Sequence, residues 1–186
     1  KGNLDDYVTQ TFYAPNVSWH VQRMGKGKNG MMVSLNASLG NHMHANGINM
    51  ELYGKGLVQG SDPGKGAGYL QPVYLEFYSQ FPAHNTVMVD GVSSYTEMLS
   101  YHAFDLMGQY PISGQKEGYY KDITYSDVYF LEPETRSDQS RLVSIVKTGE
   151  ETGYYVDIFR SKKQRKGDKF HDYYYHNLGQ TMKVMD

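Results

Sequence analysis

The amino-acid sequence of 186 residues contains no cysteine. Disulfide bonds and thiolate metal ligands are therefore excluded, and a metal site in this chain would have to use His, Asp or Glu side chains. The sequence also lacks any apolar stretch long enough to cross a membrane as a helix, and it shows no secretory signal peptide. Because it starts at Lys1 in polar sequence, without Met, we expect it to be a fragment of a longer protein.

A strong excess of one charge is also missing, because 18 Lys and Arg residues stand against 20 Asp and Glu residues, for a net charge of -2. A general nucleic-acid-binding protein would show a strong basic excess, so this balance argues against that class. It does not exclude an acidic polysaccharide, since a local basic cleft can exist within a neutral total. The densest basic segment, residues 162–166, fits a solvated hairpin turn, and the alternative is a contact with an acidic polymer at the rim of a site.

Helical periodicity is scarce, whereas the alternation of apolar and polar residues that marks half-buried strands recurs along the chain. Turn signals separate the alternating segments, and the Asn29-Gly30 pair is the strongest of them. The predicted strands are residues 17–22, 30–39, 48–53, 86–89, 124–131, 141–147, 154–160 and 170–175. Short strands at this spacing predict an all-β fold, a two-layer antiparallel β-sandwich of jelly-roll-like form with few or no helices. We expect residues 1–186 to form a single domain of this kind.

Three local features complete the structural prediction. Trp19 is expected in the hydrophobic core, because Trp is usually highly buried. Residues 91–118 are the least regular stretch and are predicted to form a long surface loop, with one helical turn at residues 96–101. The 18 Tyr residues suit half-buried strands and contacts with sugars equally well, so composition does not decide between these roles.

Side chains suited to metal binding gather in a histidine-rich segment, residues 40–47. In a strand, His42 and His44 would face the same side, where such a pair can chelate a metal or divide labour between a ligand and a catalytic group. Asp62 stands at a predicted strand end, and His84 stands where another strand begins. These residues make a plausible zinc set. Ordinary hydrogen-bonded His side chains and an Asp-Pro-Gly turn at Asp62 explain the same residues without a metal.

The block from Asn41 to Gly91 resembles the C-terminal sheet domain of the heparinase II/III-like lyases, a group that includes heparin, heparan and alginate lyases. The run from His84 to Gly91 is the most specific feature of the match. The residues that carry the resemblance are His42-x-His44, Glu51-Leu52-Tyr53, Asp62-Pro63-Gly64, Tyr69 and His84-Asn85-Thr86-Val87-Met88-Val89-Asp90-Gly91.

The resemblance implies a zinc ion held by His44, Asp62 and His84, with a mainly structural role in pinning the loops that shape a cleft. Asn46 stands where the family often has Asp, so a carboxylate that would support the ligands is replaced here by an amide. An Asn side chain can still hydrogen-bond a ligand imidazole.

The resemblance also implies two catalytic residues. His42 would face the substrate, where it would neutralise the uronate carboxylate or assist proton transfer. Tyr69 matches a cleft tyrosine of the family, and Tyr74 and Tyr78 are the alternatives on this chain.

The reaction implied by the resemblance is β-elimination on a uronic-acid sugar, so the protein would be part of a carbon–oxygen lyase acting on acidic polysaccharide or oligosaccharide. In the family, the main catalytic Tyr and an Asn/His pair belong to an α-helical toroid that precedes the sheet domain. We therefore expect that toroid to be the partner of this chain and the chain alone to have little or no lyase activity. The family also implies a periplasmic or secreted protein, with no nucleic acid or membrane as partner.

Two other interpretations remain open from the sequence. One is a non-catalytic carbohydrate-binding β-sandwich, in which aromatic residues stack on sugars and the His side chains are structural. The other is a cupin-like metal enzyme, since jelly rolls also use His-x-His pairs, with His84 as a third ligand. The sequence does not name the polymer.

Overall fold

The fold is all-β, as predicted. A computed structural model describes residues 2–3, 6–66, 68–93, 99–167, 170–179, 181 and 183–185. Four short helical segments are η2 (Pro15–Val17), η3 (Gly27–Asn29), η4 (Tyr74–Tyr78) and η5 (Phe81–Ala83). The strands are β1 (Thr11–Ala14), β2 (Trp19–Met24), β3 (Met31–Asn36), β4 (Ser38–Asn41), β5 (Asn49–Gly54), β6 (Leu57–Gly60), β7 (Val87–Val89), β8 (Leu99–His102), β9 (Asp105–Tyr110), β10 (Ile123–Glu132), β11 (Ser137–Lys147), β12 (Gly153–Lys163) and β13 (His171–Tyr173).

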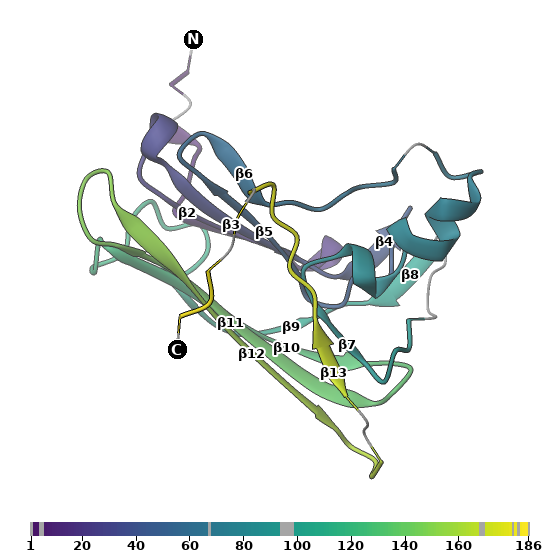
Figure 1. Ribbon diagram of the computed structural model, residues 1–186. Coiled ribbons are helices and arrows are strands. Elements are labelled where there is room, and N and C mark those ends of the chain that lie inside the picture. Colours follow the sequence, from purple (N-terminus) through teal and green to yellow (C-terminus); the bar gives the residue numbers. More distant parts are fainter. Residues whose placement is uncertain are drawn as a thin grey trace.

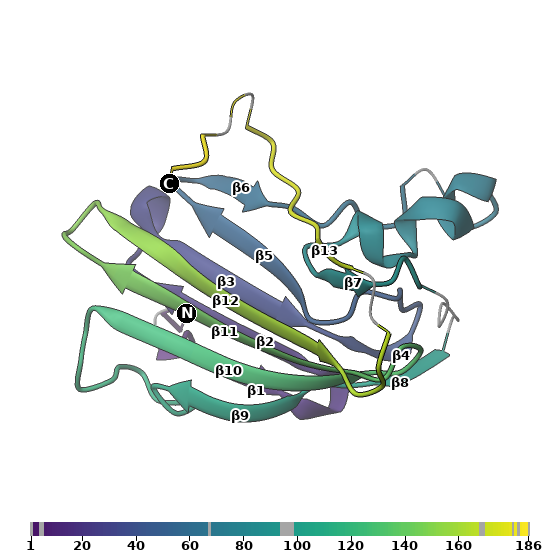
Figure 2. The same cartoon turned by 60° about the horizontal axis from the view of Figure 1, so that its bottom comes forward.

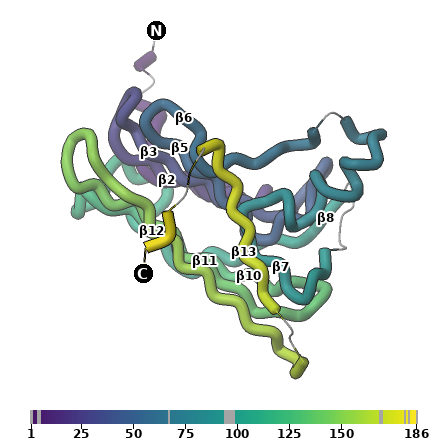
Figure 3. Tube along the Cα trace, viewed as in Figure 1, coloured from purple at the N-terminus to yellow at the C-terminus, as the bar shows by residue number. Residues whose placement is uncertain are grey.

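Two antiparallel sheets face each other and form the layers of a sandwich (Figures 1 and 2). One has the strand order β1-β2-β3-β5-β6 and the other has the order β12-β11-β10-β9. Two-stranded ribbons, β4-β8 and β13-β7, lie at one end of the sandwich beside the helical segments η4 and η5 (Figure 1). Beyond β13 the chain runs back toward β6, where Asn177 bridges to Gly60 (Figure 3). The predicted antiparallel β-sandwich is therefore confirmed.

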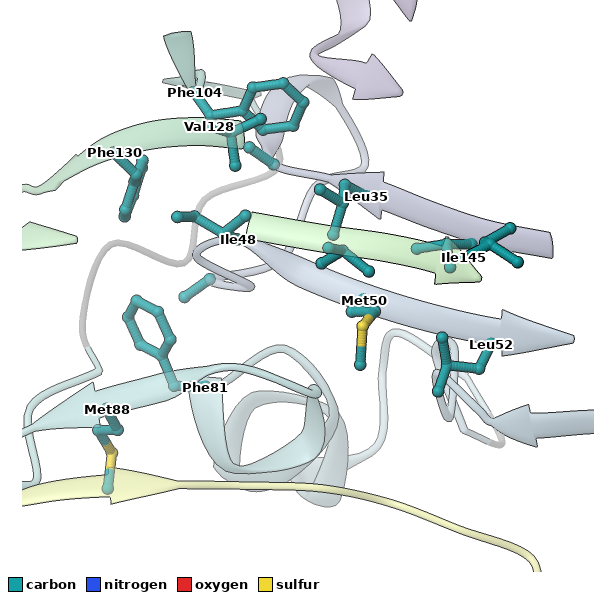
Figure 4. Close-up of a cluster of buried hydrophobic side chains, with 14 of the residues drawn as sticks. Leu35, Ile48, Met50, Leu52, Phe81, Met88, Phe104, Val128, Phe130 and Ile145 are labelled. Carbon is teal, nitrogen blue, oxygen red and sulfur yellow. The ribbon is translucent and has the colours of Figure 1, made fainter. Parts of the chain in front are cut away.

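The hydrophobic core lies between the two layers because each strand turns its alternate apolar residues inward. Leu35 and Met50 come from one sheet, Val128 and Ile145 come from the other, and Phe81 closes the end near the short helices (Figure 4). All five side chains are almost wholly buried. Truncating a buried Leu or Ile of this kind to Ala costs about 2–5 kcal/mol, so this core is the main source of stability.

The prediction that Trp19 lies in the core is wrong, because its side chain is 40% exposed. Its indole Nε1–H donates to Ser34 Oγ at 2.7 Å, and its ring packs edge-on against Phe12. The next residue on β2, His20, is fully buried instead and bonds Gln109 of β9 through Nε2 at 3.0 Å. The amphipathic indole therefore covers the outer face of the sheet, and the imidazole points toward the second layer.

The segment 91–118 is more regular than predicted, because it contains β8 and β9. Residues 99–101 of the expected helical turn are in β8, and residues 96–98 lie outside the described residues. The strands β1 and β6 were not predicted either. The predicted strand 30–39 is divided at Ala37, so that β3 stays in the five-stranded sheet and β4 pairs with β8.

Arg141 ties the four-stranded sheet to the end of the sandwich that carries the histidines. Its buried guanidinium forms two hydrogen bonds of 2.8 Å with Asp157, and it also donates to the carbonyl oxygens of Ile48 and Asn85. Ile48 precedes β5, and Asn85 follows His84. One side chain thus fixes two segments that lead into the candidate site.

No helix within the described ranges is long and apolar enough to cross a bilayer.

Candidate functional site

The histidine-rich segment lies in a loop rather than in a strand. The strand β4 ends at Asn41, and His42 has a backbone φ of 59°, in the left-handed region. The expectation that His42 and His44 face one side by strand alternation is therefore wrong. The turn at His42 separates the two rings, and each contacts a different group of residues.

His44 belongs to a buried group with His84 and Asp62. The ring centroids of His44 and His84 are 5.3 Å apart, and the Nδ1 atom of His84 lies 2.7 Å from an Asp62 carboxylate oxygen. His84 is 1% exposed. The three residues come from the loop after β4, the loop after β6 and the end of η5, so the fold brings together the set implied by the family resemblance.

The charges of these groups act on one another. Burial lowers the pKa of His44, and His84 lowers it further, while the carboxylate of Asp62 opposes the change. Burial alone would raise the pKa of Asp62, but the hydrogen bond and charge of His84 lower it overall. Burial and the nearby Asp62 raise the pKa of Glu51, which stands on β5 at the edge of the group. The site therefore holds acidic and imidazole groups in a desolvated setting, where they interact strongly.

Two asparagines that the sequence did not single out hold the buried group in place. Asn49 donates from Nδ2 to Asp62 at 3.0 Å, and its side-chain oxygen accepts the backbone N–H of Asn85. Asn85 is fully buried, and its amide donates to the carbonyl of Met50 and accepts the backbone N–H of His176. The one sequence signal for the role of Asn85 is its position directly after His84, in the run from His84 to Gly91 that carries the family resemblance.

His42 belongs to a second, exposed group with Tyr69. Their ring centroids lie 5.6 Å apart, and the Nζ atom of Lys65 stands 4.9 Å from the centre of the Tyr69 ring. Tyr69 is 38% exposed, whereas Tyr74 is only 5% exposed and packs edge-on against His44. Tyr74 also meets Tyr69 edge-on at 5.0 Å, so it separates the exposed pair from the buried group.

The third tyrosine considered from the sequence, Tyr78, is the last residue of η4, and its ring packs edge-on against Phe77. Burial, with a smaller contribution from Tyr69, raises the pKa of Tyr74, which keeps that phenol neutral. Of the three tyrosines, Tyr69 is the one whose ring lies beside His42 and is open to solvent.

The donor atoms of the buried group bear on whether it can bind a metal ion. The Nε2 atom of His84 is buried, and no hydrogen-bond partner for it lies among the described residues. An ion bound at Nε2 would leave Asp62 on Nδ1 as a support for the ring and out of reach of the ion. Ligation by both Asp62 and His84 would instead require the ion to replace the hydrogen bond between them. In the described ranges, however, no three His, Asp or Glu side chains are arranged so that they could hold a metal ion. The donor types fit zinc, and Asp62 is engaged with His84 and Asn49 rather than free.

Asn46 does not contact the buried imidazoles. It is 4% exposed, and its amide lies 3.5 Å from the side-chain oxygen of Asn36. Among the described residues, no hydrogen bond joins Asn46 to His44 or His84. The side chain that hydrogen-bonds the His84 imidazole is Asp62.

Comparisons with known proteins find similarity to polysaccharide lyases. No family model matches the chain. An endo-acting ulvan lyase of Formosa agariphila is 30% identical over 148 residues, which make up 74% of this chain and 18% of that protein. Among solved structures, the heparan sulfate lyase HepC of Pedobacter heparinus has a TM-score of 0.61 at 17% identity, covering 83% of this chain and 22% of that one. A heparinase III has a TM-score of 0.59 at 17% identity, covering 86% and 23%. The chain thus spans about a fifth of the length of these relatives, and the structural likeness shows a shared fold.

Proposed function

Because the chain is related to the heparinase II/III-like polysaccharide lyases, we propose that it is the metal-binding β-sandwich of a lyase that cleaves uronic-acid-containing polysaccharide by β-elimination. The observation that carries the proposal is the division of the site residues into two neighbouring groups. The exposed His42–Tyr69 pair is open to a substrate, and the buried His44–His84–Asp62 group lies directly behind it.

The exposed pair has the chemistry that the elimination needs. A base removes the proton at C5 of the uronate, the electron pair forms the C4–C5 double bond, and the bond from C4 to the glycosidic oxygen breaks. A donor next to the carboxylate stabilises the charge that develops in this transition state, which is the role we assign to His42. The phenol of Tyr69 is placed to move a proton to or from the reacting sugar. Lys65, beside the Tyr69 ring, adds positive charge where an acidic sugar would lie.

The buried group would hold a zinc ion through His44, Asp62 and His84. A structural zinc ion contributes folding energy, so its role would be to fix the three loops that carry these residues. One of those loops also carries His42, which links metal binding to the position of the catalytic imidazole.

The rest of the catalytic machinery is proposed to lie outside these 186 residues. We expect an α-helical toroid to supply the main base and to close the cleft over His42 and Tyr69. The chain alone would then bind oligosaccharide without cleaving it. A lyase for acidic polysaccharide would act in the periplasm or outside the cell, where its polymer is found.

Metal content tests the proposal directly. The purified chain, never exposed to chelator, should contain about one zinc per molecule by elemental analysis. His44→Ala should lose the metal, whereas His171→Ala should keep it, because His171, on β13, bonds Ser161 on β12 and does not belong to the buried group. A native chain without metal would remove the zinc site. If the longer protein with its helical domain also released no unsaturated uronate product, the lyase function would fall and a carbohydrate-binding sandwich would replace it.

A further inference from the structure

A concave surface lies at the opposite end of the sandwich from His42. In the five-stranded sheet, Trp19 pairs with Asn36 at the end that leads to β4 and the histidines, and Met24 pairs with Met31 at the other end. A pocket of about 570 Å³ opens at that other end and includes Met24 in its lining. Lys147, which also lines the pocket, ends β11 at the β11–β12 turn. That turn lies at the opposite end of the sandwich from β4 and β8 (Figure 1). We call it the basic pocket.

Positive charge is concentrated in the basic pocket. Its lining contains two acidic residues, Glu117 and Asp122, and five cationic ones: Arg23, Lys26, Lys116, Lys121 and Lys147. This excess stands out in a chain whose net charge is -2. A concave surface lined by one sign of charge focuses the field and attracts the opposite charge.

In the part of the chain that the structure describes, the ion pairs of Lys116 and Lys121 are weak. Lys121 pairs with Glu117 at 3.4 Å and Lys116 pairs with Asp6 at 3.8 Å, and both pairs are well exposed to solvent. Exposed ion pairs of this kind contribute little energy, so an incoming anion can replace them. Arg23 donates from one terminal nitrogen to the carbonyl of Thr9 at 3.3 Å, which is a neutral acceptor.

An aromatic surface adjoins the basic pocket. A neighbouring pocket of about 500 Å³ shares Lys121 and Asp122 with it and is lined also by Tyr119 and Tyr120. Tyr119 is 88% exposed and Tyr120 is 65% exposed, with their rings edge-on at 5.1 Å. Exposed tyrosines offer flat apolar area at a low cost in conformational entropy, and this suits the C–H face of a sugar ring.

The loop that carries these residues, 111–122 between β9 and β10, is fixed to the sandwich at several points. The backbone N–H of Gly118 donates to Gln10 Oε1 at 2.9 Å, and the carbonyl of Asp122 accepts the N–H of Lys147 at 2.8 Å. A Cβ atom on Gly118 would lie 2.6 Å from the Tyr110 hydroxyl, so only glycine lets the loop approach that ring. The charged and aromatic side chains are therefore displayed on a preorganised surface.

We propose that the basic pocket and the adjoining Tyr119–Tyr120 surface form a second carbohydrate site, which binds the sulfate or carboxylate groups of an acidic polysaccharide away from the His42–Tyr69 pair. The cations take the acidic substituents, and the tyrosines take the sugar ring next to them. Such a site holds the polymer whether or not it is cleaved, and it does not depend on the metal. Its existence is therefore independent of the lyase function proposed above.

Calorimetric titration of the 186-residue chain with a sulfated, uronate-containing tetrasaccharide tests the proposal. Replacing Lys121→Gln and Lys147→Gln together should weaken binding about tenfold or more, because each cation makes a charge-assisted contact. Tyr119→Ala should weaken it as well, and a neutral tetrasaccharide should not bind. The matched control, Lys162→Gln with Arg165→Gln, removes two exposed cations at the opposite end of β12 and should leave affinity unchanged. Thermal unfolding of every variant checks that the fold is kept.

The His42→Ala variant separates this site from the first one. Binding that survives His42→Ala and falls in the Lys121/Lys147 variant supports the second site. Equal losses of affinity in the Lys121/Lys147 variant and in the Lys162/Arg165 variant would mean diffuse attraction by net charge and would overturn the proposal. Loss in His42→Ala alone would also overturn it, and would leave the proposed lyase site intact.

Discussion

Arg141 and Asp157 form two parallel hydrogen bonds of 2.8 Å each across neighbouring strands of the four-stranded sheet, with the guanidinium fully buried. The same guanidinium donates to the carbonyls of Ile48 and Asn85 and stacks over Phe159. It is thereby the link between the sheet and the segments that carry the buried histidine group. A buried charge with all of its donors used specifies one arrangement of those segments.

Arg141→Met should be strongly destabilising, by about 3–5 kcal/mol, because it removes the cation paired with Asp157 and the hydrogen bonds to the carbonyls of Ile48 and Asn85. Urea unfolding followed by tyrosine fluorescence measures the change. Arg160→Met is the control on β12, where the side chain is exposed, and it should change stability by less than about 0.5 kcal/mol. Equal effects of the two substitutions would show that Arg141 is not the link described here.

The regular part of the fold could be predicted because it follows from local alternation. The strands β10, β11 and β12 have long period-2 patterns, and the predicted segments fall within them. The short strands β1, β6 and β8 were missed, because four residues carry too little pattern and their strand form comes from pairing with other strands. The six-residue strand β9 was missed as well, and it forms by pairing with β10. Trp19 was misplaced because alternation shows that two faces differ without showing which one is inside.

The candidate site residues were proposed from their chemistry and from family resemblance, but their arrangement in space was not predicted. His42 and His44 were expected to be aligned by a strand, but a left-handed turn at His42 sends them to different neighbours. Asn49 and Arg141 could not be found from sequence, because their role depends on carbonyls and carboxylates that tertiary contacts bring to them. A polar residue in a strand pattern reads as solvent-facing unless its buried partner is known.

Gly47→Ala should lower stability and disturb the loop that carries His44. Gly47 has a φ of 55°, and a Cβ atom there would lie 2.6 Å from the Phe81 ring. Gly56→Ala is a matched control, since its φ is 80° but nothing lies within 4 Å of the added atom. Backbone strain alone costs about 1–2 kcal/mol. Overpacking at Gly47 adds about 1–3 kcal/mol, so the two variants should differ by that amount in urea unfolding. Equal destabilisation would show that Phe81 can move aside.

Acid should destabilise the fold through His20. Burial lowers the pKa of His20 below its ordinary value of 6.5, while the bond to Gln109 partly opposes the shift. The other ring nitrogen, Nδ1, is buried and has no partner among the described residues. In the unfolded chain His20 takes up a proton as the pH falls below about 6.5, whereas in the folded chain it stays neutral. Its contribution to stability is therefore complete above that pH and is lost as the pH falls toward the folded pKa.

His20→Gln should reduce this loss of stability on acidification. The measurement is the free energy of unfolding by urea at several values from about pH 8 to about pH 5, for the native chain and the variant. Lowered pKa values of His44 and His102 act in the same direction in both proteins, so the difference between the two curves isolates His20. Parallel curves would contradict the prediction.

The separation of the exposed pair from the buried group should be visible in kinetics. In the longer lyase polypeptide, His42→Ala and Tyr69→Phe should each lower the elimination rate by about 10²–10⁴-fold, the usual contribution of a positioned proton-transfer group. Zinc content should stay at the native level in both, because neither residue belongs to the His44–His84–Asp62 group. Tyr78→Phe is the control, since its ring packs against Phe77 and not against His42. A full rate in Tyr69→Phe together with a loss in Tyr74→Phe would move the catalytic phenol to the buried tyrosine, and loss of zinc in His42→Ala would merge the two groups into one site.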